Sequence, residues 1–529
     1  MQLLAGSTLL RACCPNLRAC QLSSTRDLPV IRVARRTQLW LERLEKRQIR
    51  PVAAAKPGTL LISTRRRELN QAFTETYSMW EQPSLVSGGW KHRKSRGDYF
   101  TINRYREHRE WPETEDTFRA LNLDENVVSA VEALNITTPT WAQKEVIPSL
   151  LRGHNVLCAA ETGCGKTLAY LLPIMHLLVK RKDFCPDSPR SLVLVPSREL
   201  AGQVTSVARR LGSQLGITVQ FVGGGRSRRV TERKLEGMSI DLLVATPGIL
   251  WKALKWNKVS LADLNYIVLD EADTLFDKTF NELVESILMQ TQIASNAKEV
   301  QGLHRNAQLV LIGATFPKGV EDILSKVLDL GSIHTIKSTK LHLLMSHVQH
   351  TFKRVKRADK VPELLQILKQ HAAEKPKPGI QIFCNASKTV NWLSYILDDH
   401  GIKHTRLHGR IPADLRLGIF EAFQKGQTDV LVCTNVASRG LDSCRVGTVF
   451  NFDFPDNIED YMHRAGRVGR VGSKSQGSVL SFVTHAWDVE LVQTIETAVR
   501  RRSNLPGMKS RIRDSIPNRY VKENEELAN

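Results

Sequence analysis

The stretch that decides the fold is VLCAAETGCGKTLAY, residues 156–170. Apolar and small residues typical of a buried strand lead into a glycine-rich loop at residues 163–167, and apolar residues at helical spacing follow. A glycine-rich loop that ends in Lys-Thr and connects a strand to a helix is typical of a phosphate-binding loop. General loops of this kind begin with glycine, where this chain has Ala160. The stretch predicts a nucleoside triphosphate site, and a chance glycine-rich turn is the alternative.

The same alternation recurs along the chain. From about residue 118 onward, short aliphatic runs followed by small or polar residues alternate with segments of helical periodicity. Continuous aliphatic runs of this length are typical of parallel strands buried on both faces, with helical crossovers between them. The rhythm pauses near residues 335–350 and then begins again. We therefore predict an α/β fold with two tandem doubly wound parallel-sheet domains, residues 116–338 and residues 345–500.

The positive charge of the chain is concentrated at its amino end. The net charge is +21, and residues 1–110 hold 21 Lys and Arg against 9 Asp and Glu, a difference of +12. Such basic character indicates a polyanionic partner, nucleic acid before membrane. The first 26 residues combine arginines with Leu, Ala and Ser and contain no acidic residue. We interpret residues 1–40 as a mitochondrial presequence, with an untargeted basic tail as the alternative.

Two further basic segments flank the predicted domains. Residues 41–115 combine arginines with aromatic residues such as Trp90 and Phe100, a composition that suits single-stranded nucleic acid. A solvated charged face is the alternative for this extension. The tail, residues 501–529, could bind RNA or act as a nuclear signal.

The sequence also argues against some classes of protein and site. No apolar run is long enough to span a bilayer, so we expect no membrane insertion. The nine cysteines form no C-x-x-C pair and no His/Cys cluster of zinc spacing. This distribution predicts reduced core thiols and no structural zinc.

Two adjacent acidic residues follow the aliphatic run at residues 266–269. Ligands of doubly wound sheets bind beyond the carboxyl ends of the strands, so Asp270 and Glu271 are expected near the phosphate-binding loop. Asp270 can hold a magnesium ion through water, and the Thr167 hydroxyl can ligate the same ion from the loop. Glu271 can polarise the attacking water. Solvated surface charge is the alternative for this acidic pair.

With these motifs together, the chain resembles the DEAD-box ATP-dependent RNA helicases, whose name-giving motif stands here at residues 270–273. The resemblance covers residues 118–485. The phosphate-binding loop of that family reads A-x-T-G-x-G-K-T, so Ala160 is the family's residue. The resemblance implies two tandem RecA-like domains, ATP and Mg²⁺ as cofactors, and an RNA-dependent ATPase that unwinds or remodels RNA.

The resemblance also assigns residues of the ATP site. Gln143 reads the adenine edge and Phe118 stacks on the base, although Ile136 and Ala142 depart from the family pattern around that glutamine. Arg467 and Arg470 are the arginine fingers. The implied ATP-binding residues are Phe118, Gln143, Ala160, Glu161, Thr162, Gly163, Cys164, Gly165, Lys166, Thr167 and Asp442, the last at the ribose. The implied catalytic residues are Lys166, Asp270, Glu271, Arg467 and Arg470, with Thr167 and Asp270 as metal ligands.

Further residues are assigned to RNA and to the coupling of hydrolysis with strand separation. The implied RNA-binding residues are Pro196, Arg198, Gly223, Gly224, Thr246, Gly248, Arg416 and Thr434. Ile249 and Ala413 replace an arginine and a glutamine of the family's RNA motifs. The implied coupling residues are Asp273, Gly313, Thr315 and His463. Gly313 stands where the family has serine, so looser coupling is expected.

These assignments predict a function and leave alternatives open. Because the arginine fingers lie on the second domain, the site is complete only when the two domains close over ATP, and bound RNA favours the same closure. We predict an ATP-dependent RNA helicase of the mitochondrial matrix that remodels RNA or ribonucleoprotein. Mitochondrial large-subunit ribosomal RNA and assembly factors are the expected partners, and a nuclear location stays open. An ATP-gated RNA clamp or annealing factor, and a ribonucleoprotein scaffold with a vestigial site, are the alternatives.

Overall fold

The computed structural model describes residues 59–78, 80–105, 117–180, 188–224, 228–235, 239–301, 306–316, 319–338, 341–372, 378–435, 443, 445–470 and 477–506. The predicted presequence, the first part of the basic extension and most of the basic tail lie outside the described residues. Asp442 also lies outside them. Within the described part, no helix is long and apolar enough to cross a membrane.

The first domain is built on a seven-stranded sheet whose paired strands are all parallel, in the order β10-β4-β9-β8-β5-β7-β6. Its strands are β4 (Asn155–Ala159), β5 (Ser191–Leu194), β6 (Val219–Val222), β7 (Leu242–Ala245), β8 (Tyr266–Asp270), β9 (Gln308–Gly313) and β10 (Ile333–Lys337). Its helices are α3 (Glu125–Glu132), α4 (Trp141–Leu151), α5 (Lys166–Lys180), α6 (Arg198–Leu215), α7 (Arg228–Leu235), α8 (Pro247–Lys255), α9 (Ala272–Leu275), α10 (Asn281–Leu288), α11 (Ala297–Gln301) and α12 (Val320–Leu324). The predicted doubly wound parallel sheet is therefore confirmed.

The strand sequences are continuously aliphatic because both faces of this sheet are buried. Along β4, Val156 and Cys158 belong to one hydrophobic cluster, whereas Leu157 and Ala159 belong to another. Successive side chains of a strand point to opposite faces, so each face of the sheet has its own core. In the five central strands, β4, β9, β8, β5 and β7, polar residues are consequently confined to the strand ends and the loops beyond them.

The second domain repeats this architecture with parallel strands β11 to β16. They are β11 (Gln349–Arg354), β12 (Gly379–Phe383), β13 (His404–Leu407), β14 (Val430–Cys433), β15 (Val446–Asn451) and β16 (Ser478–Val483). Its helices are α13 (Lys360–Ala372), α14 (Ser387–Asp399), α15 (Ala413–Gln424), α17 (Ile458–Ala465) and α18 (Ala486–Arg501). The full sheet has nine strands in the order β13-β14-β12-β15-β16-β11-β3-β1-β2.

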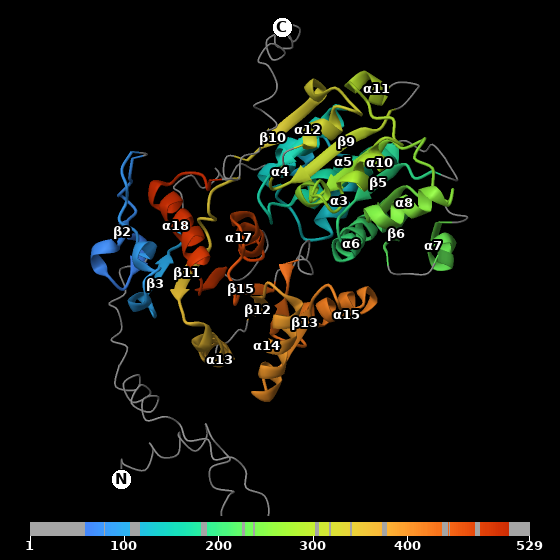
Figure 1. The fold of residues 1–529 in the computed structure, drawn as a ribbon. Helices are drawn as coiled ribbons and strands as arrows, with labels where there is room; N and C mark the ends of the chain where they lie inside the picture. Colours follow the sequence, from blue (N-terminus) through green and yellow to red (C-terminus); the bar gives the residue numbers. More distant parts are fainter. Residues whose placement is uncertain are drawn as a thin grey trace, which may run out of the picture. The chain divides into compact units, whose positions relative to one another are not determined.

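The last three strands of this sheet come from the amino-terminal extension. They are β1 (Leu60–Thr64), β2 (Gln71–Ala72) and β3 (Tyr99–Ile102), and β3 pairs antiparallel with β11 (Figure 1). Phe100 on β3 stacks on Phe352 of β11 at a ring-centroid distance of 5.0 Å. Trp90 and Phe100 are fully buried in the core of the second domain, so neither ring can stack on an RNA base. The prediction of an independent RNA-binding arm is wrong for these two residues.

A buried carboxylate fixes the same extension to α18. Glu496 is fully buried and accepts hydrogen bonds from the backbone N–H groups of Val86 and Ser87 and from the Ser87 hydroxyl, at 2.8, 3.0 and 2.6 Å. Arg500 Nε donates to Glu496 Oε1 at 2.9 Å. A buried charge is tolerated only when it is paired and hydrogen-bonded. The extension thus supplies donors that the second domain needs.

We predict that Glu496→Ala destabilises the second domain by about 3 to 5 kcal/mol, because it leaves Arg500 as an uncompensated buried charge. Urea or thermal unfolding of the full chain measures the effect. Glu490→Ala is the matched control on the same helix, since Glu490 pairs with Lys91 of the extension at 2.7 Å while both side chains are more than half exposed. Exposed pairs contribute about 0 to 1 kcal/mol. Equal effects of the two substitutions would contradict the structural role of Glu496.

Candidate nucleotide and RNA sites

The phosphate-binding loop joins β4 to α5 as the sequence predicts. Gly163 and Gly165 have φ angles of +85° and +82°, which glycine adopts without strain. A Cβ atom at Gly165 would lie 2.7 Å from the side-chain nitrogen of Gln143, so the close packing of the loop also requires glycine there. Lys166 Nζ donates to the carbonyl oxygen of Ala160 at 2.7 Å, which folds the lysine over the loop.

Gln143 and Thr140 support this loop from α4. The Gln143 amide donates to Gly165 O at 3.1 Å and accepts from Thr140 N–H at 2.8 Å, and the Thr140 hydroxyl donates to Cys164 O at 2.8 Å. Both ends of the Gln143 amide are thus engaged within the protein. Phe118 is only 1% exposed and lies in the hydrophobic core. Adenine reading by Gln143 stays a prediction, whereas the burial of the Phe118 ring argues against its stacking on the base.

The acidic loop begins where β8 ends. Asp270 is 5% exposed, and its two carboxylate oxygens accept from the Glu271 N–H and from the Tyr170 hydroxyl, each at 2.9 Å. Burial and the neighbouring Glu271 charge raise the pKa of Asp270 to about 6, against the opposing effects of Lys166 and of the two hydrogen bonds. Glu271 has a φ of +50°, a left-handed conformation that is uncommon outside glycine, and this turn points the chain into α9.

The residues present fit a magnesium–nucleotide complex. Thr167 and Asp270 offer hard oxygen ligands, and Mg²⁺ characteristically uses one or two protein oxygens together with substrate phosphates. Among the described residues, no group of three or more His, Cys, Asp or Glu side chains could hold a metal ion without such phosphates. Glu271 Oε2 and Glu161 Oε2 are buried without a hydrogen-bond partner. Buried polar atoms of this kind are normally satisfied, so both oxygens point to a polar ligand.

The coupling residues lie together. Asp273 Oδ2 accepts from the Ala314 N–H at 3.3 Å and lies 3.5 Å from His463 Nε2. Burial alone would raise the pKa of Asp273, but the hydrogen bond and charge of His463, with Lys166 and the Ala314 N–H, lower it to about 2. A Cβ atom at Gly313 would lie 3.1 Å from Thr315 O and 3.3 Å from the Phe316 ring. The Phe316 ring therefore occupies part of the space that a serine at position 313 would use, while Asp273 keeps a backbone link.

The segment after α17 contacts the phosphate-binding loop. Arg467 Nε donates to His463 O at 3.1 Å and Arg470 Nε donates to Gly466 O at 3.0 Å. A Cβ atom at Gly466 would lie 1.7 Å from Thr162 Oγ1. A Cβ atom at Gly163 would lie 2.9 Å from Arg470 Cγ. The structure therefore brings Arg470 to the phosphate-binding loop, together with the segment that carries Arg467.

The predicted RNA-binding residues of the first domain lie on the loops that follow β5, β6 and β7 and in the first turns of α6 and α8. These three strands are neighbours in the sheet. Arg198 is 8% exposed, and a Cβ atom at Gly223 would lie 3.1 Å from its Nε, so these two motifs touch. Thr246 is the N-cap residue of α8. Pro196 and Gly224 lie on loops at the same carboxyl edge, and Gly248 lies in the first turn of α8.

The RNA-binding residues of the second domain are Arg416 on α15 and Thr434 after β14. Thr434 is buried and its N–H donates to Leu407 O at 3.2 Å. Arg416 Nη1 lies 3.1 Å from Glu199 Oε1, which is a buried carboxylate of the first domain. An ion pair thus joins two motifs that were assigned separately to RNA, and nothing in the sequence indicated this pairing.

The sequence did not predict the buried hydrogen-bond network of Arg464. Arg464 is 2% exposed and donates to the side-chain oxygens of Asn435 and Asn385, each at 2.6 Å. It also donates to Asn451 Oδ1 at 3.2 Å and to Asp453 O at 2.7 Å. Asn435, which follows the predicted RNA-binding residue Thr434, accepts one of these bonds. Arg464 therefore joins the loops beyond β12, β14 and β15, and its place next to His463 was the only signal in the sequence.

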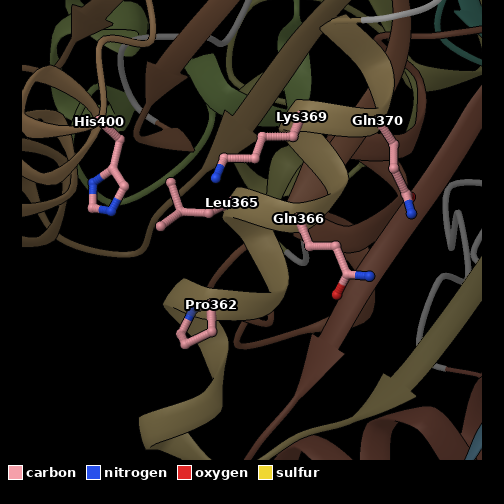
Figure 2. A pocket seen from close by; sticks show the side chains of 6 residues that line it. All are labelled: Pro362, Leu365, Gln366, Lys369, Gln370 and His400. Atoms are coloured by element: carbon pink, nitrogen blue, oxygen red, sulfur yellow. The ribbon is translucent and has the colours of Figure 1, made fainter. Parts of the chain in front are cut away.

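A surface pocket of about 490 Å³ lies away from these loops. Figure 2 shows that its lining comes mainly from α13, with His400 from the end of α14. The lining residues are Pro362, Leu365, Gln366, Lys369, Gln370 and His400. None of the predicted site residues lines this pocket.

Known proteins show the same two domains. Residues 140–323 match the family model DEAD/DEAH box helicase, and residues 359–472 match the Helicase conserved C-terminal domain. The chain is 52% identical over 515 residues to "Probable ATP-dependent RNA helicase DDX28" of Mus musculus, which covers 93% of this chain and 94% of that relative. It is 50% identical over 513 residues to the Homo sapiens protein of the same name, with 94% of each chain covered. The structure of S. cerevisiae Dbp5 bound to RNA and ADP BeF3 has a TM-score of 0.61 and 25% identity, over 73% of this chain and 94% of that one.

The contact between Gly466 and Thr162 generates a prediction. Gly466→Ala should lower RNA-stimulated ATP turnover about 10- to 100-fold, because the added methyl group displaces the arginine segment from the phosphate-binding loop and misplacement of about 1 Å can cost this much. Steady-state phosphate release measures it. Gly89→Ala is the control, since a Cβ atom there meets nothing within 4 Å. Turnover at the wild-type rate in Gly466→Ala would show that the contact plays no part in hydrolysis.

Proposed function

This chain belongs to the DEAD/DEAH box helicases, and from that membership we propose how its residues use ATP on RNA and where the protein acts. The protein is an ATP-dependent RNA helicase and an RNA-dependent ATPase. The observation that carries the proposed residue roles is the contact of residues 463–470 with the ATP loops of the first domain, through His463 with Asp273 and Gly466 with Thr162.

In the proposed hydrolysis step, the backbone N–H groups of the phosphate-binding loop and Lys166 hold the ATP phosphates. Mg²⁺, held by Thr167 and Asp270, would neutralise charge on the phosphate oxygens when bound. Glu271 orients the attacking water and accepts its proton, a role that its unpartnered buried Oε2 supports. Arg467 and Arg470 stabilise the charge that develops on the transferred phosphoryl group.

We propose that RNA binds along the loops after β5, β6 and β7 and along Arg416 and Thr434. RNA and ATP then favour the same arrangement of the two domains, so each raises the affinity for the other. Because the contacts proposed are to the RNA backbone, sequence selectivity of this core is low. The Arg416–Glu199 pair has to be exchanged for, or shared with, an RNA phosphate in this process.

The structure favours coupled remodelling over an ATP-gated clamp. The clamp alternative rests on Gly313, which lacks the hydroxyl of the family's serine, and on Ala413, which replaces a glutamine of the family's RNA motif. Asp273 nevertheless keeps a link to this motif through the Ala314 N–H and a second link to His463. The backbone hydrogen bond of residue 314 supports coupling in the absence of a hydroxyl at residue 313.

For location and target the support comes from the sequence. The arginine-containing, acid-free first 26 residues favour import into the mitochondrial matrix. A general RNA remodeller in that compartment would meet ribosomal RNA as its most abundant structured RNA. We therefore propose a role in the assembly of the mitochondrial large ribosomal subunit, together with ribonucleoprotein assembly factors, and a nuclear location is the competing proposal.

Glu271→Gln should keep ATP and RNA binding and lower ATP turnover by a factor of about 10² to 10⁴, the range for loss of a general base. Phosphate release with saturating RNA measures turnover, and fluorescence anisotropy measures RNA binding. Glu282→Gln, the same change at an exposed position of α10, should turn over at the wild-type rate. If Glu271→Gln retained wild-type turnover, the proposed role of Glu271 would be wrong.

Deletion of residues 1–26 should leave the protein outside mitochondria with its ATPase intact, because the described domain elements begin only at residue 60. Import into isolated mitochondria and microscopy of a fluorescent fusion measure the location. Deletion of residues 507–529 is the matched control and also tests the nuclear signal. Normal import of the chain without residues 1–26 would exclude the presequence.

A further inference from the structure

A fully buried tyrosine lies between the two residues proposed to hold magnesium. Tyr170 stands on α5 three residues after Thr167, which places both on one face of the helix. Its hydroxyl donates to Asp270 Oδ2 at 2.9 Å. The Thr167 hydroxyl interacts with the same phenolic oxygen and acts to lower the pKa of Tyr170, against the larger effects of burial and of Asp270, which raise it. One oxygen atom therefore joins the phosphate-binding loop to the acidic loop.

The environment of Tyr170 shows that its ring and its hydroxyl have different roles. The ring has no exposed surface and belongs to the hydrophobic cluster of the first domain, a position that phenylalanine could fill. A buried hydroxyl is costly unless it is hydrogen-bonded, and the contribution of such a bond to stability is small. The hydroxyl is consequently explained better by what it does to Thr167 and Asp270 than by stabilisation of the core.

The bond also completes the restraint on the Asp270 carboxylate. The Glu271 N–H binds Oδ1 and the Tyr170 hydroxyl binds Oδ2, so the carboxylate group cannot rotate freely. Tyr170 thus restricts the orientation of the Asp270 carboxylate.

We propose that Tyr170 is a positioning residue for magnesium–ATP, whose hydroxyl fixes the Thr167 and Asp270 oxygens relative to each other. This inference rests on the proposed function, because it takes Thr167 and Asp270 as the ligands. Mg²⁺ demands near-ideal octahedral geometry at about 2.0 to 2.1 Å, so ligand oxygens that drift by fractions of an ångström bind it less well. Residues that orient metal ligands without touching the metal typically change its affinity by about 10- to 100-fold.

The test compares Tyr170→Phe with Tyr266→Phe, which removes another fully buried phenol of the same domain, at the opposite end of β8 from Asp270. Binding of a fluorescent ATP analogue is measured in EDTA and over a series of free Mg²⁺ concentrations. Tyr170→Phe should bind the analogue like wild type in EDTA and need about tenfold more Mg²⁺ for the half-maximal gain in affinity. In ATPase assays the same variant should need about tenfold more Mg²⁺ while its kcat at saturating Mg²⁺ stays within about twofold.

Each other outcome has a defined meaning. An unchanged Mg²⁺ requirement in Tyr170→Phe, or an equal rise in Tyr266→Phe, would overturn the positioning role. A loss of analogue binding in EDTA would assign Tyr170 to loop structure and would also overturn it. If wild type itself gained no affinity from Mg²⁺, the proposed ligand roles would fail first. Thermal unfolding in EDTA confirms that both variants, which keep their rings in the core, are folded.

Discussion

The site depends on the in-register alignment of parallel strands in the first sheet. β4, β9 and β8 are neighbours, and their pairing places Ala159 beside Gly313 and Asp270 beside Ile312. The phosphate-binding loop, the loop at residues 313–315 and the acidic loop therefore emerge from one edge. β5, β7 and β6 continue that edge and present the predicted RNA loops. The nucleotide loops and the RNA loops thus lie at the same edge of one sheet, on neighbouring groups of strands. This common edge is why motifs that are far apart in sequence can act together.

Most of this edge was predictable because its information is local. A strand buried on both faces reads as a continuous aliphatic run, and the polar residues after it mark the loop where ligands bind. Gly163 and Gly165 are required by their positive φ angles, so their spacing was visible in the sequence. What the sequence could not give were contacts between distant segments. The pairing of Glu199 with Arg416 and the four bonds of Arg464 arise from packing alone.

The contacts of the amino-terminal extension were likewise not predictable from the sequence. Its arginines and aromatic residues predicted RNA contact, yet β3 pairs with β11, about 250 residues further along the chain. Such pairing has no local signature, because a strand that adds to an existing sheet differs little from any short apolar run. Glu496 was equally unpredictable, since an acidic residue in a helix usually faces solvent. Here it replaces water by the backbone donors of residues 86 and 87.

The pairing of β3 with β11 also brings together the two points of the second domain from which the chain runs to the first domain and to which it returns. Ile102 is paired with His350, and the Tyr105 N–H donates to Ser346 O at 2.9 Å. The whole first domain lies in sequence between these two points, so both of its connections start from one place on the second domain. This shared attachment limits how the two domains can move. Residues 463–470 can approach the ATP loops only by movements that both connections allow.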